Sequence, residues 1–362
     1  MNIGIPKERR PFEFRVGLSP AGVEVLSHQG HRVFIEQEAG LGAGFSDQEY
    51  EKSGAQVVFS STEVFERAEL VLKIGRPLLE ELVGIKPGAT LMGLLHLASA
   101  PHEQIDILIR NKISAVAYEQ IQLYDSSLPV LRPFSQIGGQ MSAQIAARLL
   151  QNDCAGNGIL LGGIAGVPPA EVVILGAGTV GTHATRAFLG LGAHVTVLDR
   201  DVNALQHLYD RFPHIVTMVS TRRNIERACS YADVVIGAVL VPGERAPILI
   251  TRQMLAKMKP RSVVIDLSID QGGCCETSRP TTHREPTFIE NGVTHYCVPN
   301  IPGVVARTAT HAFVNVALPY IMEVASLGIE KAIDHNPAIE LALNTHNGRK
   351  FHLQRWTTQA GD

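Results

Sequence analysis

The sequence lacks the marks of secreted, membrane-spanning and nucleic-acid-binding proteins. Residues 1–16 mix charged side chains with short apolar pieces, so they contain no continuous apolar core of a secretory signal. The uncharged stretch 154–170 contains five glycines and Pro168-Pro169, which excludes a membrane span. No Lys/Arg-rich run is present, and 32 Lys+Arg against 35 Asp+Glu leave a net charge of −3, without the basic surface that nucleic-acid binding requires. We therefore expect a cytoplasmic protein that binds neither membranes nor nucleic acids.

Cysteine is also scarce. The five cysteines form no C-x-x-C pair and lie in apolar surroundings. Such an odd, unpaired set is typical of reduced thiols inside a cell. We interpret them as inert rather than catalytic, and we predict no metal site. Cys274 and Cys275 are the only two that are adjacent in the sequence.

Glycine, in contrast, is abundant. The 33 glycines cluster between apolar runs without a three-residue period, which is typical of turns and of backbone that approaches a ligand. A length of 362 residues predicts about two domains, and 45% hydrophobic with 19% charged residues is a globular composition.

Short apolar runs alternate with helical patterns along the chain. A first series predicts strands at residues 2–5, 31–35, 70–74, 90–95 and 114–117, with helices from about Pro20 and Asp47. A second series predicts strands at residues 171–175, 194–198, 215–219, 233–238 and 262–266. This alternation predicts an α/β protein with two Rossmann-like, doubly wound parallel sheets and a cleft between them.

Helical patterns connect the two series. Apolar spacing predicts a helix over residues 135–152, a long helix from about Thr308 to Leu327 interrupted at Pro319, and a short helix at 337–344. We expect the long helix to return the chain to the first unit. The predicted domains are a discontinuous first domain, residues 1–130 and 306–362, and a continuous second domain, residues 131–305.

Residues 171–199 carry the pattern of a dinucleotide-binding unit. A buried strand is followed by Gly176-Ala-Gly178-Thr179-Val180-Gly181, a helix, a second strand and Asp199 at its end. The first glycine permits a tight turn, the second lets the backbone approach a pyrophosphate, and the third lets the helix pack on its strand. The N–H groups at the start of that helix then face the phosphates.

Asp199 favours NAD over NADP. Its carboxylate would accept hydrogen bonds from the ribose hydroxyls and repel a 2′-phosphate, whereas the adjacent Arg200 weakens this preference. A glycine-rich turn without a ligand is the alternative, which the strand, helix and acid together disfavour. The second cluster, residues 40–44, lacks this context and is interpreted as a loop.

Motifs spread over residues 2–328 resemble the alanine dehydrogenase family and its relative, the nicotinamide nucleotide transhydrogenase alpha subunit. They occur in the family's order: IGIPKE, EFRVGLSPAGVEVL, AGLGAGFSD, LHLA, AYE, DVVIGAVLVPGERAP, IDQGGC, ETSRPTTH and HYCVPNIPG. LHLA together with IDQGGC and SRPTTH favours the soluble dehydrogenase. The resemblance implies reversible, NAD-dependent oxidative deamination of L-alanine to pyruvate and ammonia in a hexamer of two-domain subunits.

The resemblance also implies roles for individual residues. His96 in LLHLAS corresponds to the acid/base, Asp270 to the aspartate that activates water and stabilises the imine, and Arg15 to a guanidinium that holds the substrate carboxylate. From spacing alone, a structural histidine, a surface aspartate and a solvated arginine are open alternatives. Residues implied to line the cofactor cleft are Ser135, Val239, Leu240, Leu267, Asn300 and Ile301, the last in place of the usual methionine.

Three positions depart from the family pattern. The family has a KVKEP-like segment whose second lysine binds the substrate carboxylate, whereas this chain reads Lys73-Ile-Gly75-Arg76-Pro77. Leu94 stands at a usually aromatic position, and Gln140 where an arginine is common. The lost contact removes roughly 1.5–3 kcal/mol of substrate binding unless Arg76 replaces it. Alternatively, Gly75 and Leu94 open the pocket to a larger or differently charged substrate.

Three hypotheses result from these observations. The first is an NAD-dependent alanine dehydrogenase in which Arg15, helped by Arg76, holds the carboxylate. The second is a dehydrogenase or imine reductase of the same chemistry that acts on another amino acid or amine. The third is a non-catalytic NAD-binding protein, which the presence of both His96 and Asp270 disfavours.

Overall fold

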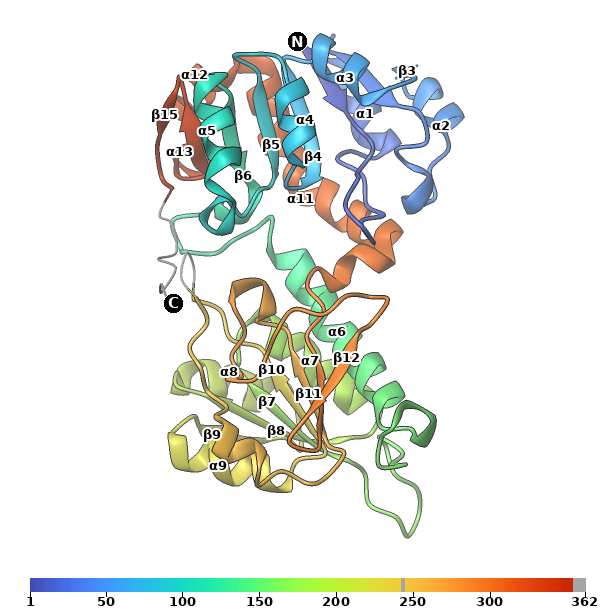
Figure 1. Ribbon diagram of the computed structural model, residues 1–362, viewed down its shortest axis with the longest axis vertical. Helices are drawn as coiled ribbons and strands as arrows, with labels where there is room; N and C mark the ends of the chain where they lie inside the picture. The colour runs from blue at the N-terminus through green and yellow to red at the C-terminus, as the bar shows by residue number, and fades with distance from the viewer. Residues whose placement is uncertain (242–244, 354–362) are drawn as a thin grey trace. The chain divides into compact units, whose positions relative to one another are not determined.

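The computed structural model describes residues 1–241 and 245–353, and the chain forms two compact units (Figure 1). Unit 1 comprises residues 1–134 and the described residues from Pro302 onward, and unit 2 comprises residues 135–301. Residues 242–244 of the motif DVVIGAVLVPGERAP, and residues 354–362 of the predicted first domain, lie outside the described residues.

Unit 1 is built on an eight-stranded sheet in the order β15-β14-β6-β5-β4-β1-β2-β3. The strands are β1 (Asn2–Ile5), β2 (Arg32–Glu36), β3 (Ala55–Val58), β4 (Leu70–Gly75), β5 (Thr90–Leu94), β6 (Ser114–Ala117), β14 (Leu343–His346) and β15 (Arg349–Lys350). The helices are α1 (Pro20–His28), α2 (Asp47–Lys52), α3 (Ser61–Arg67), α4 (Leu79–Gly84), α5 (His102–Arg110), α11 (Ala306–Leu327), α12 (Ile329–His335) and α13 (Pro337–Leu341). Strands β1 to β6 are parallel, whereas β14 pairs antiparallel with β6 and with β15.

Helices α3, α4 and α5 cover one face of this sheet, and α4 and α5 lie side by side over its strands in Figure 1. Their buried residues Phe65, Leu82 and Leu108 belong to one apolar cluster with Val71 and Leu91 of the strands. Because each helix buries one apolar stripe, the cluster fixes the strand ends that carry the polar residues described below.

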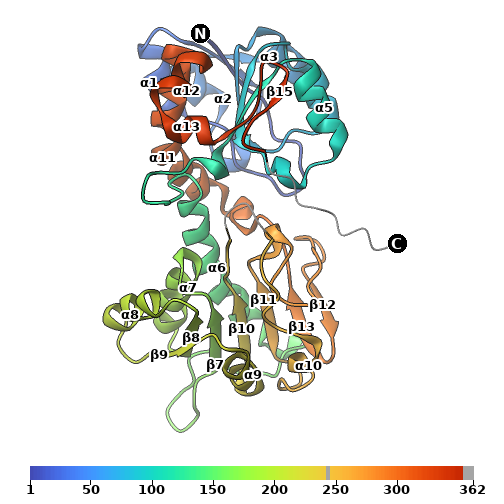
Figure 2. The same ribbon diagram turned by 90° about the vertical axis from the view of Figure 1, so that its left-hand side faces the viewer.

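Unit 2 is built on a seven-stranded sheet in the order β12-β13-β11-β10-β7-β8-β9, and Figure 2 shows β8, β7, β10 and β11 side by side. The strands are β7 (Glu171–Leu175), β8 (His194–Asp199), β9 (Val216–Val219), β10 (Val234–Gly237), β11 (Val263–Asp266), β12 (Thr287–Glu290) and β13 (Val293–Tyr296). The helices are α6 (Arg132–Leu149), through which the chain enters unit 2, α7 (Thr179–Gly190), α8 (Val202–Arg211), α9 (Arg222–Tyr231) and α10 (Arg252–Leu255). All neighbouring strands are parallel except β12 and β13.

Both faces of the unit 2 sheet are buried, as the alternation along β7 shows. Val172 and Ile174 belong to the apolar cluster that includes residues of α6, α7 and α8. Val173 and Leu175 belong to the cluster that includes residues of α9 and α10. Successive side chains of a strand point to opposite faces, so the sheet has helices on both sides, as a doubly wound fold requires.

The predicted α/β fold class is confirmed, with three corrections. The sheets are mixed rather than wholly parallel, because the hairpin β12–β13 and the strands β14 and β15 add antiparallel edges. The predicted helix at 337–344 is wrong in its last residues, since α13 ends at Leu341 and buried residues 343–346 pair with β6. The predicted interruption at Pro319 is also wrong: α11 continues through it, with the buried residues Phe313 and Ile321 on either side holding it in place.

Candidate functional site

In unit 2, the predicted cofactor residues follow the carboxyl ends of parallel strands. The sheet order places β7 and β10 next to each other. Strands β8 and β9 follow on the side of β7, whereas β11 and β13 follow on the side of β10. Ligands of open α/β sheets bind at such a switch point. The glycine loop follows β7, Asp199 ends β8, Val239 and Leu240 follow β10, and Leu267 follows β11.

The three glycines of the loop differ in what surrounds them. Gly176 has a φ of 113°, and a side chain there would overlap the carbonyl oxygen of Ala238. A side chain on Gly181 would overlap the carbonyl oxygen of Gly176, so this glycine allows α7 to approach β7. A Cβ on Gly178, in contrast, would meet nothing within 4 Å among the described residues. Gly178 therefore leaves open space at the N-cap of α7, which fits the close approach of a pyrophosphate.

Asp199 lies beside this loop. One carboxylate oxygen accepts a hydrogen bond from the Ala177 N–H at 2.6 Å, and the other accepts one from the Asp201 N–H at 2.8 Å. The acid is thus fixed between the glycine loop and the start of α8. Together, the open space at Gly178 and the fixed acid fit a dinucleotide whose diphosphate and ribose face these two positions.

A buried carboxylate that the sequence analysis missed shapes the loop of Asp270. Asp266, at the end of β11, is 1% exposed and accepts hydrogen bonds from the N–H groups of Ser268, Cys274 and Cys275 at 3.0, 2.8 and 3.2 Å. It also accepts one from the Ser278 hydroxyl at 2.6 Å. The sequence signal was an acid at the end of a fully apolar strand.

Asp270 itself is exposed and belongs to the short 3-10 helix of residues 269–271. Its Oδ2 lies 3.5 Å from the backbone N–H of Asn300, so the structure brings these two predicted residues together. Val239 is held to the same loop, because its N–H donates to Ser268 Oγ at 3.1 Å and its carbonyl accepts from that hydroxyl at 2.8 Å.

The other predicted lining residues differ in exposure. Leu240 is 47% exposed and Leu267 is half-buried, whereas Ile301 is 4% exposed and packs in the apolar cluster of unit 2. Ser135 is half-buried near the start of α6. Exposure alone therefore leaves Leu240 more accessible to a ligand than Ile301.

The five cysteines have free thiols, as predicted. Burial raises the pKa of Cys229 to about 12 and that of Cys297 to about 11. The pKa of Cys274 is also raised, by burial and then by the neighbouring Asp266. Protonated thiols are poor nucleophiles, which agrees with the inert interpretation.

Unit 1 has a switch point of its own, between β1 and β4. The polar residues predicted for the reaction, and several that were not, follow the carboxyl ends of neighbouring strands. Glu8 and Arg10 follow β1, Arg76 follows β4, His96 follows β5, and Glu119 follows β6. Parallel strands thus bring residues distant in sequence to one edge of the sheet.

His96 has an uncommon backbone conformation with a φ of 43°. Its N–H donates to Glu119 Oε1 at 2.6 Å, and the N–H of Leu95 donates to Oε2 at 3.0 Å. The imidazole is 47% exposed, with Nδ1 at 3.9 Å from Glu119 Oε1. Glu119 therefore fixes the turn while the ring stays accessible. Glu119, the last residue of the AYE motif, was not predicted as a site residue, although it follows the strand next to β5.

Arg15 is 3% exposed and bound to Glu13 through two parallel contacts, Nε to Oε1 at 2.7 Å and Nη2 to Oε2 at 2.5 Å. Its guanidinium carbon also lies 4.8 Å from the ring centroid of Phe134. Two of its three nitrogens are thus already engaged within the protein.

Arg76 is held beside His96. Its Nη1 donates to the His96 carbonyl oxygen at 3.0 Å, and its buried Nε has no hydrogen-bond partner among the described residues. Burial, followed by the positive charge of the nearby Arg10, lowers the pKa of Arg76.

Lys73, the lysine that this chain retains, does not face solvent. It is 1% exposed, and its Nζ lies 2.6 Å from Glu81 Oε1 and 3.2 Å from Glu8 Oε2. Burial opposes its charge, but the two carboxylates outweigh burial and raise the pKa of Lys73. Leu94 is buried in unit 1 and Gln140 is exposed on α6.

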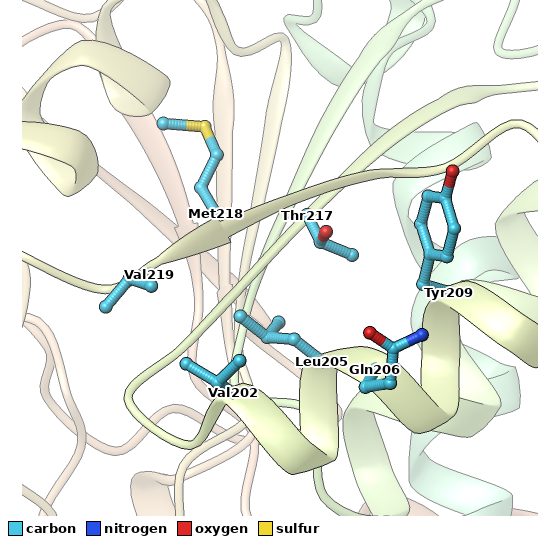
Figure 3. A pocket seen from close by; sticks show the side chains of 7 residues that line it. All are labelled: Val202, Leu205, Gln206, Tyr209, Thr217, Met218 and Val219. Atoms are coloured by element: carbon cyan, nitrogen blue, oxygen red, sulfur yellow. The ribbon is translucent and has the colours of Figure 1, made fainter.

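A separate surface pocket of unit 2 contains none of these residues. It is lined by Val202, Leu205, Gln206 and Tyr209 of α8 and by residues 217–219 of β9, and Figure 3 shows the helix and strand side chains around it. β9 is the last strand of its sheet. The candidate site is therefore formed by the residues at the strand ends described above and not by this pocket.

The chain is similar to known proteins over nearly its whole length. Residues 4–138 match the family model described as the N-terminal domain of alanine dehydrogenase/PNT, and residues 142–352 match its C-terminal domain. The chain is 46% identical over 351 residues to an alanine dehydrogenase of Methanococcus maripaludis, covering 96% of this chain and 94% of that protein.

Two solved structures extend the comparison. A structure titled L-alanine dehydrogenase matches with a TM-score of 0.93 and 46% identity, covering 97% of both chains. A transhydrogenase from Sinorhizobium meliloti matches with a TM-score of 0.81 and 26% identity, covering 97% of this chain and 99% of that one. Both similarities extend over nearly the whole chain.

Proposed function

The chain belongs to the alanine dehydrogenase/PNT family, and on that premise we propose that it catalyses the NAD-dependent oxidative deamination of L-alanine to pyruvate and ammonia, and the reverse reaction. It is an amino-acid oxidoreductase that acts on small molecules. The observation that carries the proposal for this chain is the accessible imidazole of His96 on a turn that Glu119 fixes. Deamination needs such a group to accept and return a proton.

The cofactor-binding residues of this proposal lie in unit 2. Residues 176–181 bind the diphosphate of NAD at the open space beside Gly178, and Asp199 binds the adenine ribose. Val239, Leu240, Leu267, Asn300, Ile301 and Ser135 are proposed to line its nicotinamide half. When bound, NAD accepts the hydride from the α carbon of the amino acid.

The remaining residues have proposed roles in proton transfer and substrate binding. His96 exchanges the proton, while Asp270, exposed on its fixed turn, orients the water that attacks the imine. Arg15, with Arg76 beside His96, contributes positive charge for the substrate carboxylate. We further propose that the protein acts in the cytoplasm as a homo-hexamer.

One observation favours a second candidate, an enzyme of the same chemistry with a different or larger amino-acid or amine substrate. Gly75 stands where the family's carboxylate-binding lysine is expected. A substrate panel distinguishes the two candidates, since alanine as the best substrate, not improved in Gly75→Lys, contradicts the second one.

The test of the main proposal is NADH formation from alanine and NAD at alkaline pH. We expect turnover by the unmodified protein, and a loss of about 10²- to 10⁴-fold in kcat in His96→Ala with NADH binding retained. His102→Ala is the matched control, because this histidine is exposed on α5. Absence of turnover over any reasonable alanine range contradicts the proposed function, and an unchanged kcat in His96→Ala contradicts the role of His96.

A further inference from the structure

Gly75 leaves a space in unit 1 that another side chain borders. A Cβ built at Gly75 would lie 3.5 Å from Arg10 Cδ, 3.5 Å from Glu8 Oε2 and 4.0 Å from Glu13 Oε2. These are ordinary contact distances, so neither crowding nor backbone conformation requires glycine at this position. Gly75 therefore lies within contact range of Arg10, and a side chain longer than a methyl group at position 75 would share the space beside it.

Arg10 is anchored in this place by one nitrogen. Its Nε donates to the carbonyl oxygen of Arg76 at 2.7 Å. Across residues 1–241 and 245–353, its two Nη atoms take part in no hydrogen bond or ion pair. A half-buried guanidinium with this geometry holds its stem still and leaves donors available for an incoming ligand.

Each of the other cations near this strand edge has a partner within the protein. Arg15 is bound by the carboxylate of Glu13 through two contacts. Lys73 is enclosed between Glu8 and Glu81. Arg76 donates through Nη1 to the carbonyl oxygen of His96, so it links Arg10 to the turn of the proposed acid/base.

We propose that Arg10 is a substrate-binding residue that takes the role of the family's lysine, which is absent at position 75. With Arg76 next to it, Arg10 binds the carboxylate of the amino acid or 2-oxo acid. This assignment rests on the proposed function, since it concerns the substrate of that reaction. A guanidinium fork matches the two oxygens of a carboxylate, and the neighbouring guanidinium of Arg76 adds positive charge. A bound anion also offsets the repulsion between the two arginines, which is one cause of the lowered pKa of Arg76.

The test is steady-state kinetics of Arg10→Ala in the intact enzyme, in both directions. We expect KM for alanine and for pyruvate to rise about 10- to 100-fold, as loss of a charge-assisted hydrogen bond predicts. NADH affinity, measured by fluorescence titration, should stay unchanged. Arg9→Ala is the matched control, because Arg9 is the next residue and pairs with Glu36 instead.

Rescue separates substrate binding from a structural role. In Arg10→Ala/Gly75→Lys, the lysine enters the vacated space and should recover most of the lost affinity for pyruvate. Thermal unfolding of each variant shows whether it is folded, and Arg10→Lys, which keeps the charge, should raise KM less than Arg10→Ala.

Failure of the Arg10 assignment and failure of the proposed function give different results. If the unmodified enzyme turns over alanine but KM in Arg10→Ala and Arg10→Lys stays at its original value, the assignment of Arg10 is wrong and the proposed function stands. If the unmodified enzyme does not turn over alanine, the proposed function fails. In that case, loss of pyruvate binding to the NADH complex in Arg10→Ala still supports the anion site, and retained binding overturns it.

Discussion

Two glycines of the loop after β7, compared with a third glycine at the end of α7, allow a prediction that separates ligand binding from folding. Replacement of each by alanine adds the same methyl group in three different surroundings. At Gly181 the methyl overlaps the backbone oxygen of Gly176, at Gly178 it enters open space, and at Gly190, the last residue of α7, it also meets nothing within 4 Å among the described residues.

The expected magnitudes follow from where the crowding occurs. In Gly181→Ala the overlap is with backbone, which cannot rotate away, so the folded state loses about 1–3 kcal/mol or more. In Gly178→Ala the folded state loses little, because a φ of −72° is accessible to alanine. The added methyl group instead crowds the bound diphosphate, so the NAD complex should lose roughly 1–3 kcal/mol, which corresponds to about 5- to 150-fold weaker binding. Gly190→Ala should gain about 0.5–1 kcal/mol in stability and bind NAD normally.

Urea unfolding and NAD titration of the three variants measure both quantities. The expected pattern is a lower unfolding midpoint only in Gly181→Ala and a weaker affinity with an unchanged midpoint only in Gly178→Ala. If folded Gly178→Ala binds NAD as tightly as the unmodified protein, the diphosphate does not approach this glycine. If Gly181→Ala unfolds at the original midpoint, the contact between α7 and β7 is looser than the structure shows.

Two further predictions concern pH and cofactor choice. His295 donates from Nδ1 to the Val293 carbonyl at 3.0 Å and lies 2.8 Å from Thr277 Oγ1 through Nε2; burial lowers its pKa below the usual 6.5. The contribution of the neutral His295 to stability is therefore present above pH 6.5 and lost as the pH falls through the lowered pKa. The urea midpoint of His295→Gln should therefore depend less on pH in that range than the midpoint of the unmodified protein. An equal dependence of the two midpoints on pH contradicts this prediction. Asp199→Asn keeps an acceptor for the Ala177 N–H but removes the charge, so the ratio of kcat/KM for NAD to that for NADP should fall by roughly tenfold or more. An unchanged ratio would show that Asp199 does not select the cofactor.

Much of the candidate site was predictable because its residues follow predicted strands. Gly176 and Asp199 directly follow or end apolar strands, and the order of a doubly wound sheet brings such positions to one edge. Glu119 and Asp266 were missed as scaffolding groups because their role depends on backbone N–H groups of other segments, which no side-chain pattern reveals. Arg10 was missed because its place beside a glycine far along the chain is not visible in the sequence pattern.

The parts of the fold that were predicted wrongly also depend on distant partners. Leu343–His346 has no alternation that marks a strand, and it is extended because it pairs with β6. Pro319 normally weakens a helix, but α11 buries residues on both sides of it. In both places, contacts made only in the folded protein override the local preference of the sequence.

The antiparallel pairing of β14 with β6 has a consequence for how the protein is made. Unit 1 receives this strand only after every residue of unit 2 has left the ribosome, because unit 2 lies between the two strands in the sequence. Until then β6 is an uncovered sheet edge, which other nascent chains can pair with. Unit 2 is a single continuous segment and can fold first, domain by domain. Stalled synthesis before residue 343 should therefore leave unit 2 folded and unit 1 dependent on chaperones.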